Sequence, residues 1–355
     1  MRARSCILVG QLRVTVLPQH PALPSAQVSR VPIAIHFQDG HAAERLVAGI
    51  PAAARAVREV ASAGFDDCRI YTDVEWQPSP HSLDEINRLA MTARVRLDHR
   101  DRGHSVNDEA FPISAEELID PEWTILKATA KPGDGIVSRA FNRPISRVVS
   151  LLLLKHPLIR PGHATFGTVL IALAMVGALL WFPSEFGLIA GSVLFQLASI
   201  FDGVDGEIAR ATFRTSLRGA MLDSLVDAAT NLGFVAGVVQ SLYRQGDHLS
   251  GLFGLAGLGM LTSGLCLIGL RAKHGGEPFT FNEVKERMHA TGSPVLRWLT
   301  WFTMRDFYAL AAALLIAAGL VHAAVEIFAV VAAGWLLVVL ATSLPGFRTK
   351  VIVPS

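Results

Sequence analysis

The stretch that decides the fold runs from Asp202 to Asp227 and reads DGVDGEIARATFRTSLRGAMLDSLVD. Its aspartates form two pairs, Asp202 with Asp205 and Asp223 with Asp227, whose members are three and four residues apart. A helix of 3.6 residues per turn brings both members of such a pair to one face. Two neighbouring helix ends can bring these pairs together, so the stretch predicts a site built from carboxylates.

The sequence on both sides of this stretch is apolar enough for a membrane protein, since 51% of the 355 residues are hydrophobic and only 17% are charged. About 20 apolar residues in a helix cross a bilayer. Six windows meet this length, namely residues 164–182, 187–208, 219–243, 249–270, 304–321 and 323–345. Carboxylates are tolerated within such spans only where they face protein, metal or water, so those in the second and third windows mark a functional site.

Basic residues lie in alternate connections between these windows. Arg210, Arg214 and Arg218 follow the second window, and further arginines and lysines follow the fourth and the sixth. The remaining connections hold almost no positive charge. The positive-inside rule then predicts an integral protein of the cell (inner) membrane, with both termini and the acidic stretch facing the cytoplasm.

The region before the first window is predicted to contain two parts. Residues 1–130 alternate β-like and helical runs, which indicates a small soluble α/β domain. The β-like runs are Ile33–Phe37, Cys68–Tyr71 and Trp123–Leu126, and the helical runs are Ala42–Ala63 and Leu83–Ala93. Residues 131–160 are predicted to form a juxtamembrane amphipathic helix.

The amphipathic helix is expected over Ile136–Leu154, where Arg139, Arg143 and Arg147 form one basic stripe at a helical spacing. Apolar residues supply the opposing face, a pattern typical of helices that lie among anionic headgroups. Pro144 is predicted to bend this helix, because proline removes a backbone hydrogen bond.

The acidic stretch also carries the residues that diphosphate chemistry requires. Four carboxylates suit Mg²⁺ or Mn²⁺, whose charge relieves their mutual repulsion. The small residues Gly206, Ala209 and Gly219 leave room for a bulky polar substrate, and Arg210 can neutralise a phosphate. An alcohol can attack a metal-held diphosphate in line while a carboxylate, best fitted by Asp227, accepts its proton.

The pattern DxxDGxxAR, eight residues, then GxxxDxxxD resembles the signature of the CDP-alcohol phosphotransferase family. The resemblance implies a homodimer in which six transmembrane helices, here residues 161–347, surround a cytoplasm-facing polar cavity. It also implies two metal ions and a catalytic base at Asp227. The implied metal ligands are Asp202, Asp205, Asp223 and Asp227, and the implied CDP-binding residues are Asp202, Gly206, Ala209, Arg210 and Gly219.

A second family element, Pro-Asn-x-x-Thr, resembles Pro161-Gly162-His163-Ala164-Thr165. The resemblance implies a nucleotide contact by Thr165, whereas Gly162 lacks the family's asparagine side chain. The segments Asp134–Arg139 and Asn142–Ser146 resemble those of di-myo-inositol-phosphate-phosphate synthases, which use CDP-inositol. The N-terminal domain is similar to an inositol-phosphate cytidylyltransferase but lacks its glycine-rich loop, which predicts a degenerate, non-catalytic relative.

The predicted function is metal-dependent transfer of a phosphoalcohol unit from CDP-inositol or a similar CDP-polyol to a hydroxyl acceptor, with release of CMP, in phospholipid or polyol-phosphodiester synthesis. A phosphatidyltransferase that uses CDP-diacylglycerol and a polyol or polyol phosphate is the alternative. A transporter would scatter its carboxylates over several helices, and a prenyltransferase would show a second Asp-rich motif. The net charge of +2 without basic runs gives no indication of nucleic-acid binding.

Overall fold

The structure is a computed structural model that describes residues 32–99, 110–131, 133–275 and 304–341. The chain divides into two compact units, residues 1–121 and residues 122–355. The boundary therefore lies somewhat earlier than the predicted one at residue 130.

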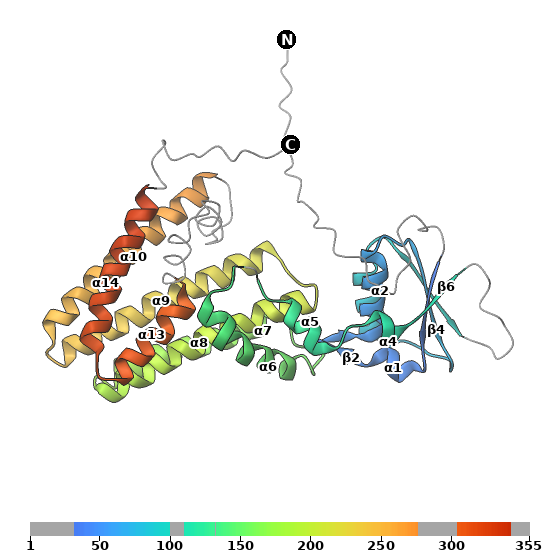
Figure 1. Ribbon diagram of the computed structural model, residues 1–355, viewed down its shortest axis with the longest axis horizontal. Helices are drawn as coiled ribbons and strands as arrows, with labels where there is room; N and C mark the ends of the chain where they lie inside the picture. Colours follow the sequence, from blue (N-terminus) through green and yellow to red (C-terminus); the bar gives the residue numbers. More distant parts are fainter. Residues whose placement is uncertain (1–31, 100–109, 132, 276–303, 342–355) are drawn as a thin grey trace, which may run out of the picture. The chain divides into compact units, whose positions relative to one another are not determined.

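The first unit is built on a parallel sheet of four strands in the order β5-β4-β1-β6 (Figure 1). Its strands are β1 (Ile33–Phe37), β4 (Asp67–Thr72), β5 (Arg94–His99) and β6 (Phe111–Ser114). Ile33 of β1 pairs with Cys68 of β4 and with Phe111 of β6. The run IAIHF of β1 is buried almost throughout, as expected for a central strand of a parallel sheet that is covered on both faces.

Short helices and a small hairpin complete this unit. They are α1 (Gly40–Glu44), β2 (Leu46–Val47), β3 (Ile50–Pro51), α2 (Ala52–Ser62), α3 (Pro80–Leu89) and α4 (Ala115–Leu118). The single helix predicted over 42–63 is therefore wrong, because Ala48 and Gly49 adopt positive φ angles of 45° and 84° and turn the chain into the hairpin. The later part of that run is helical in α2, and the strand predicted at Cys68–Tyr71 is present as β4.

The second unit is helical and begins with α5 (Glu122–Ala128), so the strand predicted at Trp123–Leu126 is wrong. Glu122 in the first turn and Lys127 in the last complement the helix dipole, a local preference that outweighs the apolar run between them. The other helices are η2 (Ser138–Asn142), α6 (Arg143–Leu153), α7 (Pro161–Trp181), α8 (Glu185–Ala211), α9 (Leu217–Arg244), α10 (His248–Gly275), α13 (Arg305–Ala317) and α14 (Val321–Ala341).

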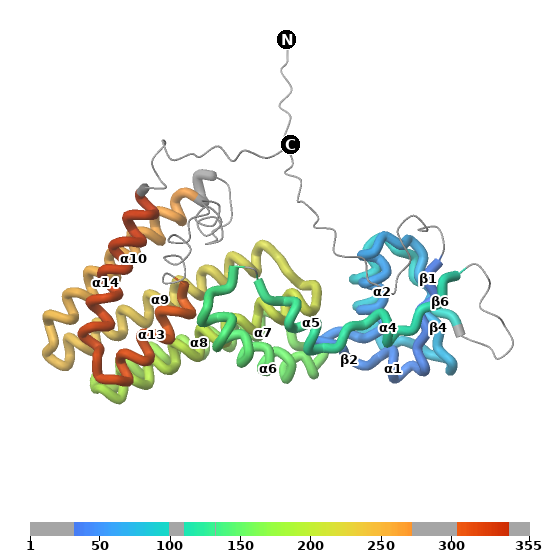
Figure 2. The backbone as a smooth tube through the Cα atoms, in the orientation of Figure 1, coloured from blue at the N-terminus to red at the C-terminus, as the bar shows by residue number. Residues whose placement is uncertain are grey.

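Five of the described helices, α7, α8, α9, α10 and α14, are long and apolar enough to cross a membrane. The fifth predicted window, 304–321, contains the 13 residues of α13, which are too few to count as a span by length. Six spans therefore stay a prediction. Helix α7 packs against α8 and α9, and α10 packs along α14 (Figure 2).

Close helix packing in this unit depends on small residues. The rings of Phe195 and Phe234 stack with centroids 4.1 Å apart, which joins α8 to α9. A methyl group added at Gly191 or Gly237 would lie within 2.5 or 2.7 Å of the Leu179 side chain. These glycines are packing points, since only glycine lets the helices approach this closely.

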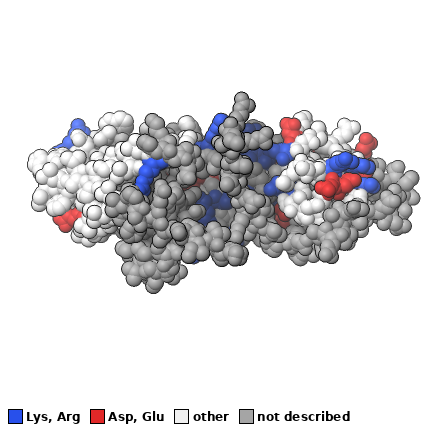
Figure 3. All heavy atoms as spheres, turned by 90° about the horizontal axis from the view of Figure 1, so that it is seen from above, with Lys and Arg blue, Asp and Glu red and all other residues white. Residues whose placement is uncertain are grey.

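Large apolar side chains point outward from these helices, as lipid contact requires. Leu173 and Phe186 are 63% and 67% exposed, respectively. Figure 3 shows that lysine, arginine, aspartate and glutamate are sparse on the described surface of the helical unit and denser over the α/β unit. The surface of a soluble helical protein is mostly polar, whereas the surface of this unit is mostly apolar, which agrees with a membrane-embedded unit.

Helix α6 buries its polar face and exposes its apolar one. Asn142, Arg143, Ser146 and Ser150 are buried against the unit, whereas Phe141, Ile145, Val148 and Leu152 are each 39 to 56% exposed. Arg143 therefore does not belong to an exposed basic stripe with Arg139 and Arg147, as the sequence suggested. Pro144 closely follows the π-helical turn η2, and the backbone of Asn142 and Arg143 stays helical, so the proline lies at an irregularity within one continuous helical run.

Candidate active site

The two acidic pairs lie on helix ends that meet at a short turn. Helix α8 stops at Ala211, and Phe213 takes a left-handed conformation with φ of 53° that reverses the chain. Helix α9 starts at once, because the Ser216 side chain accepts a hydrogen bond of 3.0 Å from the backbone N–H of Gly219. The last turns of α8 and the first turns of α9 therefore share one end of the helical unit.

The carboxylates of both helices converge on one another. Arg305 Nη1 of α13 lies 3.4 Å from Asp202 Oδ1 and also pairs with Asp227 Oδ1, so one guanidinium reaches an aspartate from each helix. Asp223 interacts electrostatically with Asp202 and Asp205. The structure thus places Asp202, Asp205, Asp223 and Asp227 in one neighbourhood, as the spacing of the two pairs led us to expect.

Thr165, at the start of α7, lies against the same group. Its hydroxyl donates a hydrogen bond of 2.9 Å to Asp205 Oδ2. Asp205 is only 8% exposed, so this bond satisfies a carboxylate oxygen that water does not reach easily. Gly162, three residues earlier, has open space where a side chain would begin.

Arg210 folds back over Gly206, one turn earlier on α8. A methyl group added at Gly206 would lie 3.0 Å from both terminal nitrogens of Arg210, so this glycine makes room for the guanidinium. Arg210 Nε donates a hydrogen bond of 2.7 Å to the backbone oxygen of Thr129. Ala209 beside it is half-buried, and Gly219 is exposed at the start of α9.

Residues 161–342 match the family model described as CDP-alcohol phosphatidyltransferase. The chain belongs to this family. Over 157 residues it is 42% identical to the bifunctional IPC transferase and DIPP synthase of Thermococcus kodakarensis, a match that covers 44% of this chain and 33% of that protein. A bifunctional IPC transferase and DIPP synthase of Aquifex aeolicus is 36% identical over 132 residues, which is 37% of this chain and 29% of that protein.

An archaetidylinositol phosphate synthase of Aeropyrum pernix is 35% identical over 85 residues, 24% of this chain and 39% of that protein. The chain thus matches about a third of the length of these curated relatives. The branch of the family expected from the sequence, the DIPP synthases, is the one to which the first two relatives belong by name.

Every candidate metal ligand at this site is a carboxylate oxygen. Such oxygen ligands suit a hard cation. Among the described residues, Asp223 Oδ1 is buried and has no hydrogen-bond partner, so one ligand atom is not committed to the protein. In the part of the chain that the structure describes, no three His, Cys, Asp or Glu side chains lie close enough to form a metal site. Asp202 and Asp227 instead face the cation of Arg305.

Sequence reasoning missed one part of this neighbourhood, the surroundings of Glu207. The Glu207 side chain is fully buried. It accepts hydrogen bonds of 2.7 Å from both Ser146 and Ser150 and pairs at 3.0 Å with Arg143, all from α6. The signal in the sequence was the spacing of these three polar residues, which place one polar stripe along α6.

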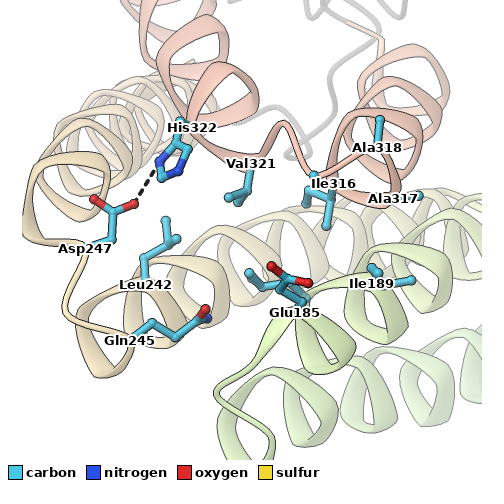
Figure 4. A pocket seen from close by; sticks show the side chains of 12 residues that line it. Glu185, Ile189, Leu242, Gln245, Asp247, Ile316, Ala317, Ala318, Val321 and His322 are labelled. Carbon is cyan, nitrogen blue, oxygen red and sulfur yellow. Dashed lines mark ion pairs between the residues drawn. The ribbon is translucent and has the colours of Figure 1, made fainter.

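The structure also contains a cavity of about 480 Å³ that lies elsewhere (Figure 4). Its lining includes Glu185 at the start of α8 together with Gln245 and Asp247 after the end of α9. His322 Nδ1 lies 2.9 Å from Asp247 Oδ2 at its rim. None of the aspartates of the motif lines this cavity, which is formed at the opposite ends of α8 and α9.

Proposed function

We propose that the chain transfers a phosphoalcohol unit from a CDP-linked donor to a hydroxyl acceptor and releases CMP. The observation that carries the proposal is the convergence of Asp202 and Asp227, from two different helices, on the Arg305 guanidinium. Family membership supplies the reaction class, and these residues supply the groups that such a reaction uses.

In the proposed reaction, the acceptor oxygen attacks the phosphorus that bears the alcohol unit. The bond from this phosphorus to the oxygen shared with CMP breaks, and CMP leaves with that oxygen. Asp227 accepts the proton of the attacking hydroxyl as general base. Arg305 pairs with the Asp227 carboxylate, so a cation lies beside the proposed base.

Other residues bind the donor in this proposal. Arg210 neutralises a phosphate of the CDP group, and Gly206 permits the folded position of its guanidinium. Thr165 contacts the nucleotide while it orients Asp205. Ala209 and Gly219 leave space along the two helix ends for the cytidine.

Two Mg²⁺ or Mn²⁺ ions would be held by Asp202, Asp205, Asp223 and Asp227 and would neutralise charge on the diphosphate. With such ions bound, Arg305 would be available to contact a phosphate group of the donor or the acceptor. The positive-inside pattern places this end of the helices in the cytoplasm of a cell-membrane protein, and we propose a homodimer as the assembly.

CDP-inositol, or a related CDP-polyol, is the proposed donor. The similarity to two bifunctional IPC transferases and DIPP synthases favours it. The similarity to an archaetidylinositol phosphate synthase supports a second candidate, a donor of the CDP-diacylglycerol type with a polyol phosphate acceptor. The first unit, whose parallel α/β sheet suits a nucleotidyltransferase relative, is proposed to be non-catalytic.

The test is to incubate the purified full-length protein in lipid vesicles with Mg²⁺ and either labelled CDP-inositol or labelled CDP-diacylglycerol, together with inositol phosphate as acceptor. We expect CMP release from one donor, loss of activity with a chelator, and recovery on addition of Mg²⁺ or Mn²⁺. Asp227→Asn should reduce turnover by about 10²- to 10⁴-fold, the usual contribution of a general base, with donor binding retained.

Asp247→Asn, at the opposite end of α9, is the matched control and should keep its activity. Absence of CMP with every donor would refute the proposed reaction. Activity of Asp227→Asn equal to that of Asp247→Asn would remove Asp227 from the role of base.

A further inference from the structure

The carboxylate of Glu207 belongs to the motif helix α8 but faces away from the aspartates. It follows Asp205 by two residues, so the two side chains leave opposite sides of the helix. Burying a charge is costly unless it is paired and hydrogen-bonded, and Glu207 is both. Its partners are Arg143, Ser146 and Ser150 of α6, at 2.7 to 3.0 Å.

Arg143 extends this contact to a second carboxylate. Its Nε and Nη2 donate hydrogen bonds of 2.9 and 3.1 Å to the two oxygens of Asp134, while Nη1 contacts Glu207 and the backbone oxygen of Gly203. A methyl group at Gly203 would lie 3.2 Å from Arg143 Nη1, so this glycine of the motif allows the approach. One arginine thus joins α8 to the residues that precede η2.

Asp134 ends a short connection that follows α5 and precedes η2. This connection, called the linker segment, comprises residues 129–131 and 133–134. The backbone oxygen of Thr129 accepts the hydrogen bond from Arg210 Nε, and Lys131 interacts electrostatically with Asp205 and Asp223. One end of the linker segment therefore orients Arg210, and the other end is held by Arg143.

We propose that Glu207 is a positioning residue that acts through Arg143. Its carboxylate holds Arg143, and Arg143 holds Asp134. The linker segment is thereby kept where the backbone oxygen of Thr129 orients the guanidinium of Arg210. The effect on catalysis rests on the proposed function, in which Arg210 contacts a donor phosphate. The effect on the linker segment does not depend on that function.

The test compares Glu207→Gln with Ser150→Ala. The glutamine variant keeps the size of the side chain but removes the charge that pairs with Arg143, whereas the alanine variant removes one hydrogen bond and keeps the ion pair. We expect Glu207→Gln to raise the KM for the CDP-linked donor about tenfold with little change in kcat, as follows from weakening one charge-assisted contact. Ser150→Ala should leave KM unchanged.

Hydrogen–deuterium exchange of peptides covering the linker segment gives a readout that needs no activity. Exchange should become faster in Glu207→Gln and stay as in the wild type in Ser150→Ala. Glu326→Gln, on an exposed residue of α14, controls for loss of a carboxylate in the same unit. Asp134→Asn removes the other charge that pairs with Arg143. This variant should also raise the KM for the donor and speed exchange of the linker segment, and it provides the test if Glu207→Gln fails to fold.

Unchanged exchange and unchanged KM in both Glu207→Gln and Asp134→Asn would overturn the positioning role, even if their thermal stability fell. Equal effects in Ser150→Ala and Glu207→Gln would also overturn it, because the ion pair would then not carry the effect. If the wild type releases no CMP from any donor, the proposed function fails, and the exchange comparison alone decides the positioning role.

Discussion

Replacement of Arg143 by methionine is expected to destabilise the helical unit strongly. Methionine is of similar length and fills most of the space, so the main loss is the cation. Arg143, Asp134 and Glu207 have side chains that are 8%, 10% and 0% exposed. Removing the central cation leaves two carboxylates in surroundings that water barely reaches.

The magnitude follows from this burial. Breaking a buried ion pair by removal of one partner costs about 3–5 kcal/mol, because the remaining charge is uncompensated. Taking the cost as that of one broken pair gives about 4 kcal/mol. For a unit of this size each kcal/mol lowers the unfolding temperature by about 2–4 °C, so Arg143→Met should lower it by about 8–16 °C.

The assay is thermal unfolding of the purified protein in detergent at pH 7, with Arg139→Met as the matched control. Arg139 is exposed on the neighbouring η2, and loss of an exposed charge costs about 1 kcal/mol or less. The contribution of Asp134 is fully present at this pH. Burial alone would raise its pKa, but the hydrogen bonds and charge of Arg143 outweigh burial and lower the pKa from 3.8, so the contribution is lost only in stronger acid.

A double variant separates the loss of a charge pair from the loss of packing. Arg143→Met combined with Glu207→Met removes both buried charges and should recover about half of the lost stability, because an apolar pair can replace a buried ion pair. A drop for Arg143→Met no larger than that for Arg139→Met would refute the reasoning. So would a double variant whose loss equals the sum of the two single losses.

Gly206→Ala should weaken binding of CMP or CDP about tenfold by calorimetry, because its methyl group must displace the Arg210 guanidinium that lies 3.0 Å away. Gly259→Ala on α10, where nothing lies within 4 Å of the added methyl group, should bind like the wild type, and equal affinities in both variants would contradict the packing argument. In the first unit, burial would raise the pKa of Glu44, but hydrogen bonds from Ser82, Ser79 and Trp76 lower it from 4.5. Glu44→Gln should therefore reduce the unfolding temperature of this unit at pH 7. The difference from the wild type should shrink as pH falls below about 4.5. A difference that stays constant down to pH 3 would show that the charge of Glu44 contributes nothing to stability.

The sequence by itself determined the membrane class and the family, and it predicted the place and the chemical type of the proposed site. These depend on local properties, since an apolar run of sufficient length forms a spanning helix wherever it occurs. The spacing of Asp202 to Asp205 and of Asp223 to Asp227 sets which side chains share a helix face, independently of any neighbour. Strand β1 was predicted at its exact bounds for the same reason, because its apolar run and its period are local.

Local sequence patterns gave the wrong secondary structure in two places, one with a backbone turn and one with a short helix. The run from residue 42 to residue 63 looks helical throughout, but the positive φ at Ala48 and Gly49 divides it, and no local pattern requires that. Trp123–Leu126 is apolar enough for a strand, yet it lies in α5. At Ala48 and Gly49 the surrounding chain overrides a weak local preference, whereas in α5 the charges at the two helix ends outweigh the apolar run.

Only the tertiary structure decided the partners of the charged residues. Glu207 and Arg143 are 64 positions apart in the sequence, and Arg305 reaches Asp202 from α13. A helical pattern tells which way a side chain leaves its own helix but not what lies opposite. The buried polar face of α6 and the contacts of Glu207 arise because α6 packs on α8, and a buried charge is stable only where folding brings a partner to it.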